Sequence, residues 1–313
     1  MKQFDPQWID CDVLCIVGPT ASGKTKFAVW CAEQISRIKG SEAEIISADS
    51  RQVYRDMNLG TGKDLDDYGS INYHLINIVE AGEKYNLFRY KQDFHKAYND
   101  IISKGHFPIM CGGSGLYVES ICKDYSLKAV EPDLDLRRTL EQKPMQELID
   151  ILTLLKKNKG IKPHNVTDFD TKKRVIRAIE IELNEENHNI TTDSTKTAKT
   201  EKLKFKVLGL NPLREKRNRL IDQRLEKRLQ EGMIEEVKGL LERGIPAEDL
   251  IYYGLEYKFI TKYLIGDFDY DYMKELLAVA IHQFAKRQMT WLRGMERRGT
   301  PIEWVNPDDY YTE

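Results

Sequence analysis

Residues 18–25 form the clearest chemical pattern in the chain. Their sequence, GPTASGKT, matches G-x-x-x-x-G-K-[ST] and lies between an apolar segment and a helical one. In that context backbone amides and a helix N-terminus bind phosphate, Lys24 adds a positive charge, and the Thr25 hydroxyl is placed to ligate Mg²⁺. We therefore predict a phosphate-binding loop at residues 18–25, here called the P-loop. The motif does not identify the reaction.

Two further turns carry side chains that could do chemistry. The first holds Asp49, which could bind Mg²⁺, accept a proton or simply cap a turn, and it follows a predicted strand. The second is GGSGLY (112–117), in which Ser114 could cap the next helix or contact a ligand. Because ligands of open α/β sheets bind at the carboxyl ends of the strands, we expect both turns to lie beside the P-loop.

The elements that position these turns alternate between strand and helix. Such alternation predicts a P-loop NTPase-like α/β fold, with a parallel sheet flanked by helices, a helical insertion domain and a helical C-terminus. The expected domains are an α/β core (1–122), the insertion (123–203) and a return strand with C-terminal helices (204–313). The expected strands are 12–17, 44–50, 74–79, 107–113 and 204–210. The expected helices are 24–38, 88–104, several in 133–184, 213–243, 246–264 and 271–298, and a polar mobile loop is expected at 185–203.

The overall charge does not indicate nucleic-acid binding, because the 313 residues include 48 Lys and Arg and 50 Asp and Glu. Local clusters differ. Lys172, Lys173, Arg174 and Arg177 share helical spacing, and residues 281–298 hold five cations against one Glu. Such runs are either solvated helix faces or RNA-binding surfaces. The five cysteines form no C-x-x-C pair, so we expect reduced thiols. No apolar segment is long enough to span a bilayer, and the first residues do not resemble a signal peptide. We therefore expect a cytoplasmic protein.

Seven motifs together resemble the bacterial-type tRNA dimethylallyltransferase (isopentenyl-tRNA transferase) family. In chain order they are GPTASGKT, SADSRQVY, GTGK, GGSGLYVES, KRVIRAIE, GMIEEV and AKRQMTWLRG, spanning roughly residues 12–298. The resemblance implies transfer of a dimethylallyl group from dimethylallyl diphosphate to N6 of the adenine 3′-adjacent to the anticodon, with release of diphosphate. It also implies Mg²⁺ as cofactor, the tRNA anticodon stem-loop as partner, and no zinc finger. A monomer is the default expectation.

The resemblance also assigns roles to residues. Catalytic roles fall to Asp49, as general base, with Lys24 and Ser114. Binding of diphosphate falls to Gly18, Thr20, Ala21, Ser22, Gly23, Lys24 and Thr25, with Thr25 on the metal. Arg224 is assigned to diphosphate or to tRNA. Contacts to tRNA fall to Asp49, Ser50, Arg51, Gln52, Ser114, Lys173, Arg174, Arg177, Tyr257, Lys258, Lys286 and Arg287.

Several positions depart from the family pattern. Ser114 replaces a threonine but keeps the hydroxyl, and Lys173 replaces a glutamine. Asp64 stands where a proline follows GTxK, while Glu256 and Phe259 replace a glycine and a glutamate in the GIGYKE stretch.

Three alternatives stay open at this point. An adenylate isopentenyltransferase would share the P-loop and Asp49 but would prenylate AMP without RNA. A small-molecule or nucleotide kinase would explain the P-loop alone and would consume ATP. A non-catalytic RNA-binding protein would have no use for intact Lys24, Thr25 and Asp49.

Overall fold

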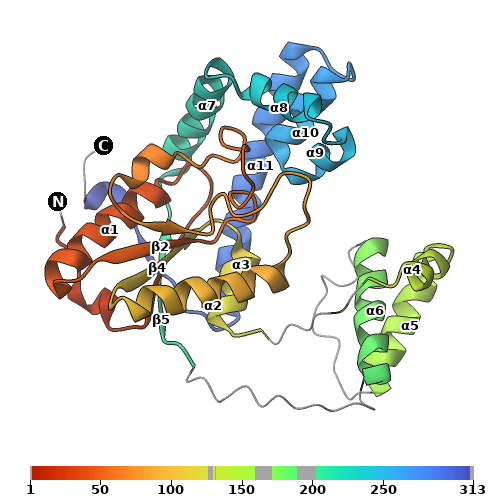
Figure 1. Cartoon of the computed structure of the whole chain (residues 1–313), viewed down its shortest axis with the longest axis horizontal. Helices are drawn as coiled ribbons and strands as arrows, with labels where there is room; N and C mark the ends of the chain where they lie inside the picture. Colours follow the sequence, from red (N-terminus) through yellow and green to blue (C-terminus); the bar gives the residue numbers. More distant parts are fainter. Residues whose placement is uncertain (1, 126–129, 131, 159–170, 189–201, 311–313) are drawn as a thin grey trace. The chain divides into compact units, whose positions relative to one another are not determined.

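A computed structural model describes residues 2–125, 130, 132–158, 171–188 and 202–310. The chain divides into two compact units, one made of Met1–Tyr125 with Lys202–Glu313 and the other of Ser126–Glu201 (Figure 1). The polypeptide therefore leaves the first unit, forms the second and returns to the first.

The first unit is built on a parallel six-stranded sheet with the order β3-β2-β4-β1-β5-β6. Its strands are β1 (Val13–Val17), β2 (Ala43–Ser47), β3 (Tyr73–His74), β4 (Phe107–Gly112), β5 (Phe205–Leu210) and β6 (Glu303–Val305). Because β4 pairs with both β1 and β2, the turns that follow these three strands are neighbours at one edge of the sheet.

Strand residues alternate between two apolar layers. Cys15 of β1 and Phe94 of α2 (Leu87–Ser103) belong to one buried cluster, whereas Ile16 of β1 and Phe27 of α1 (Lys24–Lys39) belong to the other. Since both faces of the central strands are buried, these strands read as continuous apolar runs in the sequence. The helices between the strands are α1 (Lys24–Lys39), α2 (Leu87–Ser103) and α3 (Gly115–Cys122).

Five helices complete the first unit: α7 (Arg214–Gln230), α8 (Met233–Glu242), α9 (Ala247–Tyr253), α10 (Leu255–Leu264) and α11 (Tyr270–Arg297). The expected single helix at 213–243 is wrong, because Gly232 adopts φ 100° and separates α7 from α8. The expected helix at 246–264 is likewise two helices, which meet at Gly254. Helix α11 packs against α3, α7 and α10, which brings its motif residues toward the sheet.

The second unit is helical in its described part, with α4 (Leu134–Glu141), α5 (Met145–Asn158) and α6 (Lys172–His188) around a small core of its own. Buried Glu180 accepts hydrogen bonds from the Arg137 guanidinium, from Arg177 and from the Asp133 backbone N–H. Burial opposes ionisation, but these donors outweigh it and lower the pKa of Glu180. The carboxylate thus joins α6 to α4. Of the expected loop at 185–203, helix α6 takes the first residues, and 189–201 lie outside the described residues.

Three strand predictions need correction. The strand expected at 74–79 is only β3, because Leu75 and Asn77 adopt φ of 62° and 57° and turn the chain. The strand expected at 44–50 ends at Ser47, and the short β6 was not expected.

All five cysteines are free thiols. None of the helices in the described part of the chain combines the length and apolar composition that a bilayer crossing needs.

Candidate active site

The three predicted turns meet at the carboxyl edge of the sheet. The Ser114 hydroxyl accepts a hydrogen bond from the Ser50 backbone N–H at 3.0 Å and lies 3.4 Å from the Ser50 hydroxyl. The Ser114 backbone N–H donates to the carbonyl of Ala48 at 3.2 Å. Although Ser114 occupies the N-cap position of α3, its side chain makes no capping bond. Its hydroxyl instead joins the second glycine turn to the Asp49 turn.

Asp49 is half-buried between these turns. Its Oδ1 accepts a hydrogen bond from the Arg51 backbone N–H at 2.9 Å, as a turn-capping carboxylate does. Among the described residues no hydrogen bond reaches Oδ2, so one carboxylate oxygen can accept from a ligand. The Asp49 charge also acts on Lys24 and Arg224, which places all three in one electrostatic site.

The P-loop brings Lys24 into this site. Its Nζ donates to the carbonyl of Pro19 at 2.7 Å, inside the loop. Burial lowers the pKa of Lys24 to about 8, although the nearby Cys111 and Asp49 act to raise it. The Ser22 hydroxyl is buried and has no hydrogen-bond partner in the described structure. A loop with a desolvated cation and an unpaired donor is suited to an anionic ligand.

Gln288 of α11 links the P-loop to the second glycine turn. Its Oε1 accepts from the Thr20 backbone N–H at 2.8 Å, and its Nε2 donates to the Gly113 carbonyl at 3.0 Å. One turn further along α11, Trp291 packs on Gly115 so closely that an added Cβ would lie 2.1 Å from the ring. The AKRQMTW segment therefore supports the site from inside, a role that sequence reasoning missed for Gln288.

Two arginines of α7 face the P-loop across a small pocket. Arg224 and Arg228 line it together with Thr20 and Ala21 of the P-loop and Glu256 of α10. The rest of the lining is apolar and consists of Ile221, Leu225, Met233 and Ile281. Burial lowers the pKa of Arg224 and raises that of Glu256, since each loses hydration. The pocket thus combines two guanidinium groups and part of the P-loop with an apolar wall.

The GTGK loop, in contrast, is held by internal bonds. Lys63 is 1% exposed and donates to the Tyr54 carbonyl and to the side chains of Asn58 and Asn77, so it is no phosphate ligand here. Glu236 of α8 accepts from the backbone N–H groups of residues 58–60. Burial lowers the pKa of Lys63 to about 8.

Tyr257 and Gln52 complete the support of this loop. Tyr257 is fully buried and donates to Glu236 at 2.6 Å, so it does not present a surface to tRNA. Gln52 accepts from Ser47 at 3.1 Å and donates to the Gly62 carbonyl at 3.0 Å, which uses both ends of its amide within the protein. Both residues position the loop that leads to Asp64.

The other expected tRNA contacts are distributed over both units. Lys286 and Arg287 are exposed on α11, with Arg287 stacked at 5.8 Å on exposed Phe284. Lys258 on α10 and Arg51, which stacks at 5.2 Å on Tyr252, are half-buried. In the second unit Lys173 and Arg174 are exposed, whereas Arg177 is bound to Glu180 and to the Val130 carbonyl. Arg177 therefore has a structural role within its unit.

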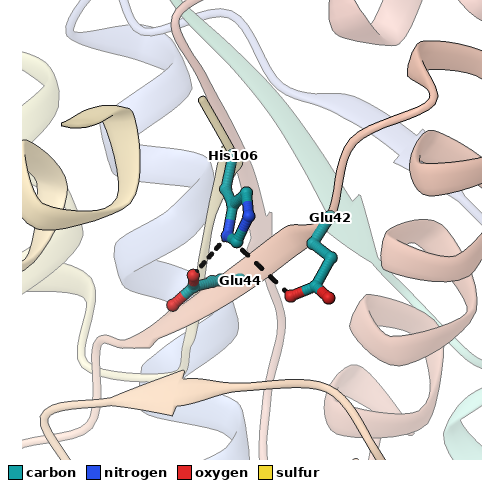
Figure 2. Close-up of side chains that lie close together, drawn as sticks. All are labelled: Glu42, Glu44 and His106. Atoms are coloured by element: carbon teal, nitrogen blue, oxygen red, sulfur yellow. Dashed lines mark hydrogen bonds and ion pairs between the residues drawn. The ribbon is translucent and has the colours of Figure 1, made fainter. Parts of the chain in front are cut away.

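A different ionisable cluster lies at the opposite, amino-terminal edge of the sheet (Figure 2). Buried Glu44 of β2 accepts hydrogen bonds at 2.6 Å from Nδ1 of His106 and from Nε2 of His74. Together with Glu42, Glu44 and His106 have the spacing of metal ligands, but Lys104 Nζ already lies 3.6 Å from Glu44. The cluster ties β2, β3 and β4 together, and we assign it no ligand.

Comparison with known proteins agrees with this geometry. A family model described as IPP transferase matches residues 52–295. The chain is 51% identical to tRNA dimethylallyltransferase 1 of Azobacteroides pseudotrichonymphae and 52% identical to tRNA dimethylallyltransferase 2 of Porphyromonas gingivalis, with 94% of this chain and 93% of each relative covered.

Solved structures give the same result. The tRNA isopentenylpyrophosphate transferase of Bacillus halodurans is 30% identical, with a TM-score of 0.64 over 94% of this chain and 89% of that one. A eukaryotic dimethylallyltransferase acting on tRNA, 22% identical, shares the fold with a TM-score of 0.72 over 94% of this chain and 74% of that one. The parallel sheet with its P-loop is thus P-loop NTPase-like, and the chain belongs to the IPP transferase family of tRNA dimethylallyltransferases.

Proposed function

We propose that this protein transfers a dimethylallyl group from dimethylallyl diphosphate to N6 of the adenine 3′-adjacent to the anticodon of tRNA, and that the joined turns at the sheet edge are its active site. Relatives that cover nearly the whole chain carry the name of this activity. The observation that carries the site assignment is the junction of the Asp49 and Ser114 turns beside the P-loop, whose residues Thr20 and Ala21 line a pocket with Arg224.

The P-loop and Arg224 bind the leaving group. When the bond between the allylic carbon and oxygen breaks, negative charge develops on the diphosphate. Arg224 lines a pocket with Thr20 and Ala21 of the P-loop, and Lys24 belongs to the same loop, so these groups can stabilise the charge. The apolar wall of the pocket beside Arg224 suits the five-carbon group of the donor.

Asp49 accepts the proton that the adenine amine loses as it attacks the allylic carbon. Its Oδ1 is held by the Arg51 N–H, which leaves Oδ2 directed to a substrate. Ser114 fixes the backbone of Ser50 and so orients the turn that carries the base. The adenine must leave the anticodon-loop stack to reach this carboxylate.

A divalent metal, Mg²⁺ by family resemblance, fits the same place. Thr25 of the P-loop offers its hydroxyl, an oxygen ligand of the kind that Mg²⁺ binds. When bound, the ion supplies positive charge to the diphosphate.

Contacts to tRNA come from exposed cations in both units. Lys286 and Arg287 beside Phe284 offer phosphate binding and stacking, and Lys173 and Arg174 offer the same charge on the unit 126–201. We assign Arg51 and Lys258 to the same interaction. Arg177 contributes indirectly, by holding helix α6, which carries Lys173 and Arg174, whereas Tyr257 and Gln52 hold the loop that leads to Asp64.

One experiment separates this function from its nearest rival. The protein is incubated with labelled dimethylallyl diphosphate, Mg²⁺ and either unmodified tRNA or AMP. We expect label in tRNA only. Label in AMP without RNA would identify an adenylate isopentenyltransferase instead. A parallel sample also contains ATP, and consumption of ATP without transfer would identify a kinase.

A further inference from the structure

The arginine pair beside the P-loop already holds an anion that belongs to the protein. The Oδ2 atom of Asp64 lies 2.6 Å from Nη2 of Arg224, and Oδ1 lies 2.9 Å from Nη2 of Arg228. The Asp64 side chain is 44% exposed, whereas that of Arg228 is only 9% exposed. A solvent-accessible carboxylate thus neutralises guanidinium groups that line the P-loop pocket.

The backbone at Asp64 is suited to this contact. Its φ is 42°, in the left-handed region that proline cannot adopt and that Asp tolerates better than most residues. The proline expected at this position by family resemblance would therefore require another backbone path. Asp64 supplies both a charge and a turn at the start of the 3-10 helix Leu65–Tyr68.

We propose that Asp64 is an internal competitor for the prenyl donor, because its carboxylate already neutralises the Arg224 guanidinium that the diphosphate uses. The proposal rests on the assignment of Arg224 to diphosphate made above. Asp64 and the Gly62 carbonyl occupy Nη2 of Arg224, so a diphosphate meets the remaining N–H donors of a guanidinium whose charge is already balanced, and the two anions repel each other. Arg228 shares the Asp64 carboxylate, because both Asp64 oxygens lie within 3.1 Å of its Nη2.

The charge of the pocket supports competition rather than simple positioning. Arg224 is already held by a second acceptor, the Gly62 carbonyl at 3.2 Å, so its place does not depend on Asp64 alone. Glu256 and Asp49 add two more carboxylates that act on Arg224. Each negative charge near Arg224 opposes an anionic ligand, and within the described part of the chain only the Asp64 carboxylate is in direct contact with that guanidinium.

The same charge affects product release. After transfer, the diphosphate product lies at Arg224, and the neighbouring Asp64 carboxylate repels it. Loss of the Asp64 charge is therefore expected to lower the KM for the donor and also kcat where release limits turnover.

The test measures the dissociation constant of inorganic pyrophosphate with Mg²⁺, by titration calorimetry on the full chain at fixed ionic strength. Asp64→Asn removes the charge and tolerates the same φ. Asp66→Asn removes one charge two residues away, where the exposed side chain has no hydrogen bond or ion pair to either arginine within the described part. Arg224→Ala tests the assignment on which the proposal rests, and circular dichroism confirms that each variant is folded.

We expect Asp64→Asn to bind pyrophosphate about three- to tenfold more tightly than the wild type, and Asp66→Asn to bind like the wild type. Unchanged or weaker binding by Asp64→Asn, together with weaker binding by Arg224→Ala, would overturn the competition and leave the Arg224 assignment intact. Unchanged binding by Arg224→Ala would instead refute that assignment and the competition with it. If both Asn variants bound pyrophosphate more tightly by the same factor, the effect would come from the net charge of the protein and not from the contact of Asp64 with Arg224, which would overturn the proposal.

Discussion

The link between α11 and the two glycine turns makes a quantitative prediction for Gln288→Met. Methionine has nearly the same length and helix propensity as glutamine, so the substitution removes two hydrogen bonds and little else. Gln288 is 8% exposed, and its partners are the Thr20 backbone N–H and the Gly113 carbonyl. In the variant, the Thr20 N–H and the Gly113 carbonyl would both lose a hydrogen bond at a position that the side chain of residue 288 shields from water.

The magnitude follows from these two bonds. A buried polar group left unsatisfied costs about 1–3 kcal/mol, and each lost bond is worth about 1 kcal/mol net. We therefore expect the free energy of unfolding to fall by about 2–4 kcal/mol. The P-loop also becomes less ordered at Thr20, so pyrophosphate must order the loop when it binds. If that ordering costs about 1.4 kcal/mol of binding free energy, the dissociation constant of pyrophosphate rises about tenfold.

The assay combines urea unfolding with calorimetric binding of pyrophosphate. The matched control is Gln283→Met, the same exchange at an exposed position of the same helix. We expect the control to behave like the wild type in both measurements. If Gln288→Met also behaved like the wild type, the bridge between the turns would contribute nothing, and our account of α11 as an internal support would be refuted.

Two further predictions concern lysines whose pKa is lowered by burial. Lys24 has a pKa of about 8 in the free protein, so it loses its proton as the pH rises through 8. The affinity for pyrophosphate should then fall above pH 8. The fall should be smaller for Lys24→Arg, because arginine stays charged. Parallel pH profiles of pyrophosphate affinity for the wild type and Lys24→Arg would contradict this prediction. Replacing buried Lys63 by methionine leaves three acceptors unpaired and should lower the free energy of unfolding by about 2–4 kcal/mol in urea. Exposed Lys238→Met is its control, and equal stability of the two variants would rule out a structural role for Lys63.

Local sequence patterns predict most of the site. The P-loop, the Asp49 turn and the Ser114 turn each follow an apolar strand, and parallel strands place their carboxyl ends at one edge of the sheet. The fold class follows from the same alternation of strands and helices. The backbone turns at Leu75 and Gly232 lie within continuous apolar or helical patterns, so β3 and the α7–α8 boundary were not predicted.

Long-range pairs could not be predicted in this way. Gln288 contacts Thr20 across 268 residues, and Arg228 contacts Asp64 across 164 residues. No local period or spacing records such a pair, because it arises only when helices α7 and α11 pack on the sheet. Tyr257 illustrates the same limit, since the family resemblance implied a tRNA contact whereas packing buries its side chain against Glu236.

The central claim is that Asp49 accepts the proton from the adenine amine while the P-loop holds the diphosphate. Single-turnover transfer of labelled dimethylallyl to saturating tRNA by Asp49→Asn tests it most directly, with tRNA affinity measured in parallel. The account predicts a rate lower by about 10²–10⁴-fold with tRNA affinity within a few-fold of the wild type. A wild-type rate of transfer by Asp49→Asn would contradict it.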